Sequence, residues 1–175
     1  MPDYEYCILK SENEIFQYEK ALYHSFKFKY PEYVAEMYDE IKADRLRSKS
    51  IPYSSQVIYA IKINDELISC SAVCVNPKQK FKIELMGFKF EKTDKHCEGI
   101  NFFSIKKFAN QKISGMKIYS GFRKFIFADL KKRGFNFILS SCDEKTKNFY
   151  LAMGANLINS ICIYNKKEYL IEYKL

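Results

Sequence analysis

The fold is decided by Asp143-Glu144-Lys145-Thr146-Lys147-Asn148-Phe149-Tyr150-Leu151-Ala152-Met153-Gly154-Ala155. Asp143 is a residue type whose carboxylate accepts hydrogen bonds from the free N–H groups at the start of a helix. Gly154 suits the left-handed turn with which a helix commonly ends. This stretch therefore predicts a short helix from Glu144 to Met153.

A longer helix and a buried strand precede this stretch. Apolar residues from Ile118 to Leu130 recur at helical spacing, and Lys131-Lys132-Arg133-Gly134 places cations and a glycine at the helix end. The run 135–141 is short, continuous and apolar, which is typical of a strand buried on both faces and parallel to a neighbour. Together these segments predict an α/β fold.

The remainder of the chain adds two helices and several strands. Ser11 and Glu14 have capping-box spacing at the start of a helix that continues to about Phe26. Pro31 suits the first position of a second helix, which is expected to reach about Arg45. Alternating apolar residues and turn signals predict the strands 4–9, 57–63, 67–75, 81–85, 96–105, 156–164 and 168–174.

Composition indicates one globular domain that spans residues 1–175. Apolar residues make up 47% and aromatic residues 17% of the 175, which excludes a disordered or fibrous chain. No apolar run approaches the roughly 18 to 20 residues needed to span a bilayer, and Met1 to Glu5 is acidic, so we expect a cytoplasmic protein. The six scattered cysteines are expected to be free thiols.

The charge balance favours an acidic partner. Lys and Arg number 29 against 21 Asp and Glu, a net charge of +8 that suits phosphorylated cofactors, an acidic carrier protein or nucleic acid. Nucleic acid is the least expected of these, because the chain has no block of five or six like charges. Cys70 and Cys74 lack the spacing and partner ligands of a metal site, so no metal is expected.

The stretch from Asp143 to Ala155 resembles the late motif of the GNAT superfamily of N-acyltransferases. Phe149, Tyr150 and Gly154 match that motif in register, while Asp143 stands for its Asn and Ala155 for its final Phe. The order of elements over residues 56–164 is also similar. The resemblance implies a single-domain fold with a central, mixed, mostly antiparallel sheet flanked by helices. It also implies transfer of an acyl group from acetyl-CoA or another acyl-CoA to a small-molecule or peptide amine.

The resemblance places the acyl-CoA phosphates between residues 111 and 121. The family's loop reads Arg or Gln, two residues, Gly, one residue, and Gly or Ala. Gln111 with Ser114 and Met116, or Lys112 with Gly115 and Lys117, fits it incompletely. Counting back from Gly134 instead brings Ser120-Gly121 into this role. The expected phosphate contacts are Lys112, Gly115, Met116, Lys117, Ser120 and Gly121, with backbone N–H groups at a helix start as donors.

One branch of the superfamily is a second candidate. The segment from His96 to Phe102 is faintly similar to the Glu-bearing strand of acyl-homoserine-lactone and N-acyl amino acid synthases, without the Arg that commonly follows the Glu. Those enzymes take acyl chains from acyl carrier protein, which is strongly acidic. A third reading is a GNAT-like binding module that has lost catalysis, which also explains an incomplete phosphate loop.

The resemblance also implies roles for single residues. Tyr150 matches the tyrosine that protonates the departing thiolate, although a core aromatic is the plain alternative. Glu98 is a candidate general base, against a solvated strand-edge carboxylate; His96 and Glu84 are weaker candidates. Phe103, Ser104, Ile105 and Asp143 are expected to contact the donor. Tyr30, Tyr33, Met37 and Tyr53 are expected to line the acceptor pocket.

Overall fold

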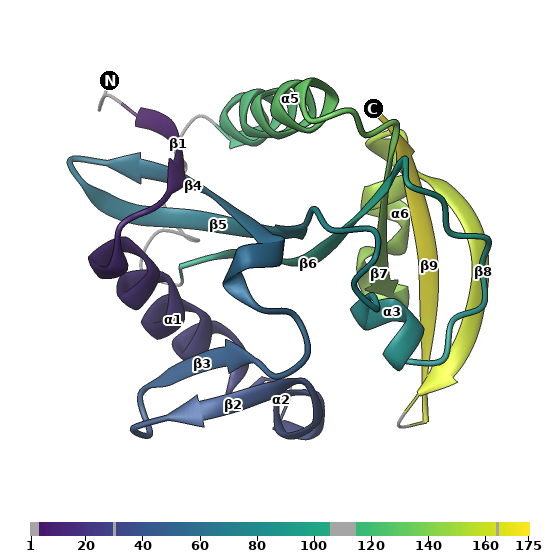
Figure 1. Ribbon diagram of the computed structural model, residues 1–175, viewed down its shortest axis with the longest axis horizontal. Helices are drawn as coiled ribbons and strands as arrows, with labels where there is room; N and C mark the ends of the chain where they lie inside the picture. The colour runs from purple at the N-terminus through teal and green to yellow at the C-terminus, as the bar shows by residue number, and fades with distance from the viewer. Residues whose placement is uncertain (1–3, 30, 106–114, 164) are drawn as a thin grey trace.

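The computed structural model describes residues 4–29, 31–105, 115–163 and 165–175, with only the backbone for Gly115, Met116 and Lys117. The elements in chain order are β1 (Tyr4–Leu9), α1 (Glu12–Phe26), α2 (Pro31–Met37), β2 (Tyr38–Ile41), β3 (Arg45–Ser48), η1 (Tyr53–Ser55), β4 (Gln56–Ile63), β5 (Glu66–Cys74), α3 (Lys82–Leu85), β6 (His96–Ser104), α5 (Gly115–Lys132), β7 (Phe137–Asp143), α6 (Glu144–Ala152), β8 (Asn156–Ile163) and β9 (Lys166–Lys174) (Figure 1).

A seven-stranded sheet in the order β1-β4-β5-β6-β7-β9-β8 forms the centre of the molecule, and β2 and β3 form a separate hairpin. Every pairing in the large sheet is antiparallel except that of β6 with β7. The helix α5 connects these two parallel strands, as a crossover must. The predicted α/β fold with a mixed, mostly antiparallel sheet is confirmed.

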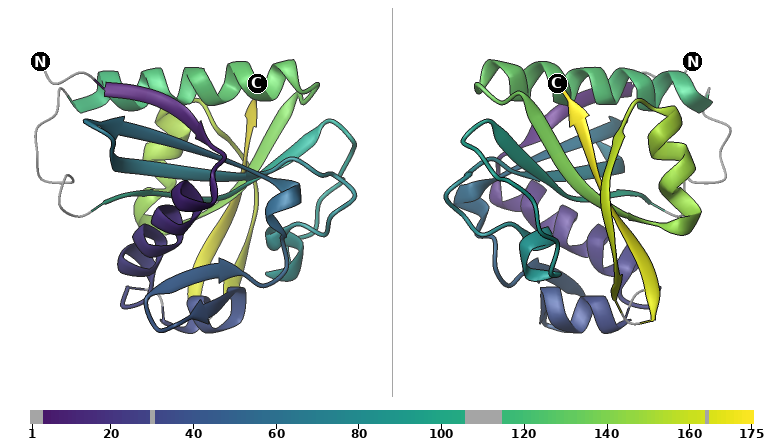
Figure 2. Two further views of the ribbon diagram at one scale, coloured as in Figure 1. Left: turned by 60° about the vertical axis from the view of Figure 1, so that its left-hand side comes forward. Right: turned by 90° about the vertical axis from the view of Figure 1, so that its right-hand side faces the viewer.

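Helices cover both faces of the sheet. Leu22 of α1 and Ile83 of α3 share a buried cluster with Leu139 of β7, whereas Phe122 of α5 packs with the adjacent β7 residue Ile138. Neighbouring strand residues point to opposite faces, so α1 and α3 lie on one side of the sheet and α5 on the other (Figure 2). The helix α6 lies on the α5 side, where Tyr150 packs against Cys142.

Several local predictions are confirmed. The Ser11 hydroxyl accepts the N–H of Glu14 at 3.3 Å, and the Glu14 carboxylate accepts the N–H of Ser11 at 3.0 Å, which is the expected capping box. Asp143 accepts the N–H of Thr146 at 2.9 Å and so caps α6. Gly154 has a φ of +92°, which is the left-handed turn predicted for the end of that helix.

Two element predictions are wrong. The second helix ends at Met37 instead of Arg45, because Lys42 and Ala43 adopt φ of 52° and 57° and turn the chain between β2 and β3. The predicted strand 81–85 contains the short helix α3. The Glu98 carboxylate accepts the free N–H groups at the start of this helix, and that interaction depends on tertiary structure.

In the part of the chain that the structure describes, no helix combines the length and the apolar character needed to cross a bilayer. The longest helix, α5, carries charged residues along its length and ends with Lys131 and Lys132. Its apolar residues Ile118, Phe122 and Ile126 face the sheet, so α5 is the amphipathic cover of a buried core.

Candidate functional site

The two parallel strands at the centre of the sheet part after three residue pairs. His96, Cys97 and Glu98 of β6 pair with residues 137–139 of β7, and beyond Glu98 each strand pairs only with its outer neighbour. The Ser140 hydroxyl donates a 3.1 Å hydrogen bond to the Gly99 carbonyl where the strands diverge. The sheet therefore has an open edge in its middle, between its two halves (Figure 1).

The backbone of β6 alternates between its partner β5 and this open edge. The Ile105 N–H bonds to the Ile68 carbonyl at 2.9 Å, and the Phe103 carbonyl accepts the Ser69 hydroxyl at 2.7 Å, so both residues face β5. Strand alternation then places the backbone polar groups of Phe102 and Ser104 on the open edge. Of the expected donor contacts Phe103, Ser104 and Ile105, only Ser104 presents its backbone to the gap.

The start of α5 lies on the chain just after β6. The first four N–H groups of a helix have no partner within the helix. In α5 these are the N–H groups of residues 115–118. Gly115, Met116 and Lys117 therefore fit the expected phosphate contacts by backbone position. Lys112 lies outside the described residues.

Ser120 and Gly121 do not fit the phosphate role. They lie in the second turn of α5, where backbone N–H groups bond within the helix. A Cβ on Gly121 would lie 2.3 Å from the Tyr6 hydroxyl, which itself donates to the Ile118 carbonyl at 2.7 Å. Gly121 is thus required for the close packing of β1 on α5, and this corrects its predicted place in the phosphate loop.

Asp143 and Tyr150 both belong to α6 and its cap. The Asp143 carboxylate accepts hydrogen bonds from the backbone N–H and the hydroxyl of Thr146, and so it caps the start of α6. Tyr150 lies in the second half of α6, later than expected, and packs beside Cys142 and Tyr169. Its carbonyl accepts the Tyr173 hydroxyl at 3.3 Å, which fixes this turn of the helix onto β9.

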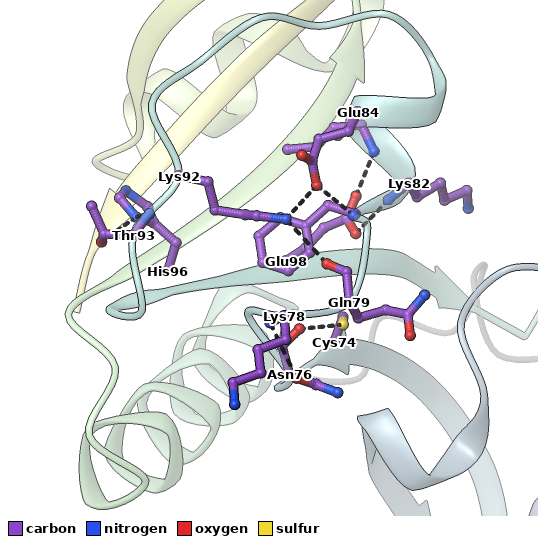
Figure 3. A network of polar contacts seen from close by, with 12 residues as sticks. Cys74, Asn76, Lys78, Gln79, Lys82, Glu84, Lys92, Thr93, His96 and Glu98 are labelled. Carbon is purple, nitrogen blue, oxygen red and sulfur yellow. Dashed lines mark hydrogen bonds and ion pairs between the residues drawn. The ribbon is translucent and has the colours of Figure 1, made fainter.

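Glu98 is fully buried in the centre of the molecule. Its two carboxylate oxygens accept the backbone N–H groups of Lys82 and Ile83 at 2.8 and 2.7 Å (Figure 3). Burial raises the pKa of Glu98 to about 7, against the lowering effect of these two amide bonds and of the Lys82 charge. The structure thus contradicts a solvated strand-edge carboxylate and shows a buried carboxylate that holds the start of α3.

Lys82 is a buried cation beside this carboxylate that the sequence reading did not single out. The residue is 3% exposed, and its ammonium donates to the Tyr38 hydroxyl at 2.8 Å and to the Ile100 carbonyl at 3.2 Å. The ammonium also lies 4.4 Å from the centre of the Tyr33 ring. Lys82 therefore joins α3, β2, α2 and the part of β6 that borders the gap.

The weaker base candidates have structural partners. The His96 ring accepts the Thr93 N–H at Nδ1 at 3.0 Å, and its Nε2 lies 3.4 Å from a Glu172 carboxylate oxygen. Glu84 forms an ion pair with Lys92 at 2.6 Å (Figure 3). Both side chains therefore stabilise the segments around α3.

A pocket of about 330 Å³ lies on the α2 and α3 side of the sheet. It is lined by Tyr33, Glu36, Met37, Leu85, Met86, Cys162 and Ile163. Two of the expected acceptor residues, Tyr33 and Met37, line it, whereas Tyr30 lies outside the described residues. Tyr53 lies elsewhere, because its hydroxyl donates to the buried Glu19 carboxylate at 2.7 Å. Tyr53 is not among the described residues that line this pocket.

Solved acyltransferase structures share this arrangement over nearly the whole chain. The AHL synthase LasI is 10% identical with a TM-score of 0.74, over 99% of this chain and 91% of that chain. The N-acyl amino acid synthase FeeM from uncultured soil microbes is 12% identical with a TM-score of 0.61, over 99% and 92%. The ribosomal-protein-S18-alanine N-acetyltransferase from Escherichia coli is 8% identical with a TM-score of 0.59, over 98% and 94%.

This chain has the GNAT acyltransferase fold. No family model and no curated protein matches the sequence. The fold of the GNAT acyltransferases is thus retained here at identities of 8 to 12% with the three structures above. A shared fold does not fix an activity, which depends on the residues of the site.

Within this GNAT fold, the cysteines behave as small apolar residues. Cys70, Cys74, Cys97 and Cys142 are buried, and burial raises the pKa of Cys74 and of Cys142 to about 11. Thiols of this kind are poor nucleophiles at neutral pH. Among the described residues, no group of three or more His, Cys, Asp or Glu side chains could hold a metal ion.

The residues that sequence reasoning missed come from α3 and the last two strands of the GNAT fold. Lys82, Leu85 and Met86 border the gap or the pocket because α3 packs there, and the alternation of Phe81 with Ile83 gave no sign of a helix. Ile163 lines the pocket from β8. A lysine inside an apolar run was the one signal that pointed to a buried charge.

Proposed function

We propose that this chain is an N-acyltransferase that moves an acyl group from acetyl-CoA or another acyl-CoA to an amine. The observation that carries the proposal is the parting of β6 from β7 beyond Glu98. An extended thioester arm can lie along the open edge and bond to the backbone groups of Phe102 and Ser104, much as an added strand would.

Donor and acceptor approach this gap from opposite faces in the proposal. The free N–H groups at the start of α5 form a positive helix end that suits the donor phosphates, and α5 covers one face of the sheet. The pocket lined by Tyr33 and Met37 lies on the other face. A reacting thioester carbonyl between the strands is then accessible to an amine from the pocket side.

The chemistry requires one bond to form and one to break. The amine nitrogen attacks the thioester carbon, the C–S bond breaks, and the departing thiolate takes a proton. We assign that proton to the Tyr150 hydroxyl, which α6 carries on the donor face. Glu98 is a positioning residue, since its carboxylate is buried and holds α3 through Lys82 and Ile83.

The test is an acyl-transfer assay on the full chain. Acetyl-CoA and octanoyl-CoA are each incubated with a mixture of primary amines, and the N-acyl products are identified by mass spectrometry, because the exposed Cys162 would react with thiol reagents. A donor present at 100 times its dissociation constant should also stabilise the fold by ~2.7 kcal/mol. No product and no stabilisation with either donor would contradict the proposal.

A donor carried by acyl carrier protein is the second candidate. The observation that favours it is the net charge of +8. An acidic carrier would be attracted to such a chain, and added salt would weaken that attraction. Octanoyl carrier protein should then give a higher kcat/KM than octanoyl-CoA at low salt, and the advantage should fall as salt rises.

A further inference from the structure

One half-buried carboxylate lies on β9, next to the edge strand β8. Glu168 of β9 pairs with Asp143 of β7 on one side and with Ile161 of β8 on the other. Leu170 lies two residues further along β9 and is fully buried in the core that α1 and α3 cover. Because residues two apart on a strand share a face, Glu168 points to the α2 and α3 side, where the pocket lies.

The Glu168 side chain lacks a partner of its own. Among the described residues it makes no hydrogen bond and no ion pair, while other carboxylates of the chain do, such as Glu14 with Lys62 and Glu84 with Lys92. Glu168 is only partly exposed, and this burial, together with the Asp143 charge, raises its pKa against the lowering effect of Lys166. A half-buried carboxylate without a partner is costly unless a ligand supplies the opposite charge.

Glu168 also lies next to a residue of the pocket wall. Glu168 pairs across the strands with Ile161, and Ile163 lies two residues further along β8 and lines the pocket. Glu168 and Ile163 are therefore diagonal neighbours on one face of the sheet. On the α2 side, the Glu168 charge is close enough to Tyr33 to help raise the pKa of that phenol. Among the described residues, the titratable groups that interact electrostatically with Glu168 are Asp143 and Cys142 of β7, Lys166 of β9 and Tyr33 of α2.

The pocket itself suits an apolar body. Tyr33, Met37, Leu85, Met86 and Ile163 form most of its wall, and Glu36, which is negative, is the one charged residue among the described residues that line it. At about 330 Å³ it lies at the small end of ligand pockets. A cationic head beside Glu168 and an apolar body in the pocket would complement both features.

We infer that Glu168 binds the ammonium group of the acceptor and accepts its first proton, and that the pocket selects primary amines with a compact apolar body. This inference rests on the proposed acyl transfer. Conversion of an ammonium ion to an amide releases two protons from the nitrogen. Glu168 takes one of these protons and passes it to water. The second proton replaces the one that Tyr150 gives to the departing thiolate, so the reaction releases one proton overall.

The test measures amine binding without any donor. Isothermal titration with n-hexylamine and 1-hexanol compares the wild type, Glu168→Gln and Glu172→Gln. Glu172 lies on the same strand and face, but its carboxylate contacts His96, so it is the matched control. We expect n-hexylamine to bind at least 10-fold more weakly to Glu168→Gln than to the other two proteins. The binding of 1-hexanol should be the same in all three.

Equal binding of n-hexylamine to the wild type and Glu168→Gln, or no binding to the wild type, would overturn the inference. Acyl transfer then separates the two proposals. If the wild type transfers acyl groups and Glu168→Gln matches its kcat/KM for amines, the enzyme assignment stands and the role of Glu168 fails. If Glu168→Gln loses amine binding while no donor is turned over by the wild type, the amine site stands and the acyl-transfer proposal fails.

Discussion

The Glu98 carboxylate accepts a 2.8 Å hydrogen bond from the backbone N–H of Lys82. The ammonium of Lys82 donates a second hydrogen bond, to the Ile100 carbonyl. One lysine therefore contacts β6 through both its backbone and its side chain, on either side of the position where β6 leaves β7. This arrangement fixes α3 beside the gap. It also buries a carboxylate whose pKa is raised to about 7.

Glu98 should make stability fall as pH rises. Its carboxyl titrates near 4.5 when unfolded and near 7 when folded, so between these values the folded state keeps a proton that the unfolded state has lost. The stability difference between the wild type and Glu98→Gln should therefore fall by about 3 kcal/mol from pH 4.5 to 7 and then level off. Urea unfolding at several pH values measures it.

The control for this measurement is Glu91→Gln, which removes an exposed carboxylate from the segment between α3 and β6. That variant should unfold like the wild type at each pH. A pH-independent difference between the wild type and Glu98→Gln would show that the Glu98 carboxyl titrates alike in the folded and unfolded states.

The fold was predictable from sequence because its signals are local. Capping by Ser11 and Asp143, the turn at Gly154 and the continuous apolar strand before α6 each depend on a few neighbouring residues. Those elements, in that order, leave few ways to build a sheet. The hairpin of β2 and β3 was missed because Met37 and Tyr38 continue a helical apolar pattern, while Arg45 and Arg47 are held by the distant Glu19.

The site was less predictable because its residues meet only in three dimensions. Tyr33 and Met37 were expected together and do share the pocket, since they lie one turn apart on α2. Glu98 and Lys82 come from different elements, and the burial of each depends on the packing of α3. Glu168 reads in sequence as an ordinary residue of a closing hairpin, and only the strand pairing places it diagonally next to Ile163 of the pocket wall.

Gly121→Ala should destabilise the protein. Alanine inside a helix is normally favoured over glycine by about 1 kcal/mol. Here the added methyl would meet the Tyr6 hydroxyl, so we expect a net loss of about 1 to 3 kcal/mol in the free energy of unfolding. Chemical denaturation measures this. The same substitution in a Tyr6→Phe background should cost less, because the nearest clashing atom is gone; an equal cost in both backgrounds would contradict the contact.

Charge reversal before and at the start of α5 should weaken donor binding. Lys112→Glu with Lys117→Glu places two negative charges near the proposed phosphate position, so affinity for octanoyl-CoA should fall and its salt dependence should flatten. Lys131→Glu with Lys132→Glu makes the same change in net charge at the other end of α5 and serves as the control. Affinity that falls equally in both double variants would indicate a general effect of charge and discard this placement of the phosphates.

Tyr150→Phe should slow the chemical step without weakening the fold. The substitution keeps the ring that packs beside Cys142 and Tyr169 and removes only the hydroxyl. General acid catalysis is typically worth 10² or more, so kcat should fall by about that factor while donor affinity is retained. Tyr173→Phe removes the hydroxyl that bonds to the Tyr150 carbonyl and is the matched control, with kcat near that of the wild type. Single-turnover acylation of an amine measures the rate of the chemical step in both variants. If Tyr150→Phe lowers the unfolding temperature while kcat stays at the wild-type value, Tyr150 is a core residue of α6 and another group protonates the thiolate.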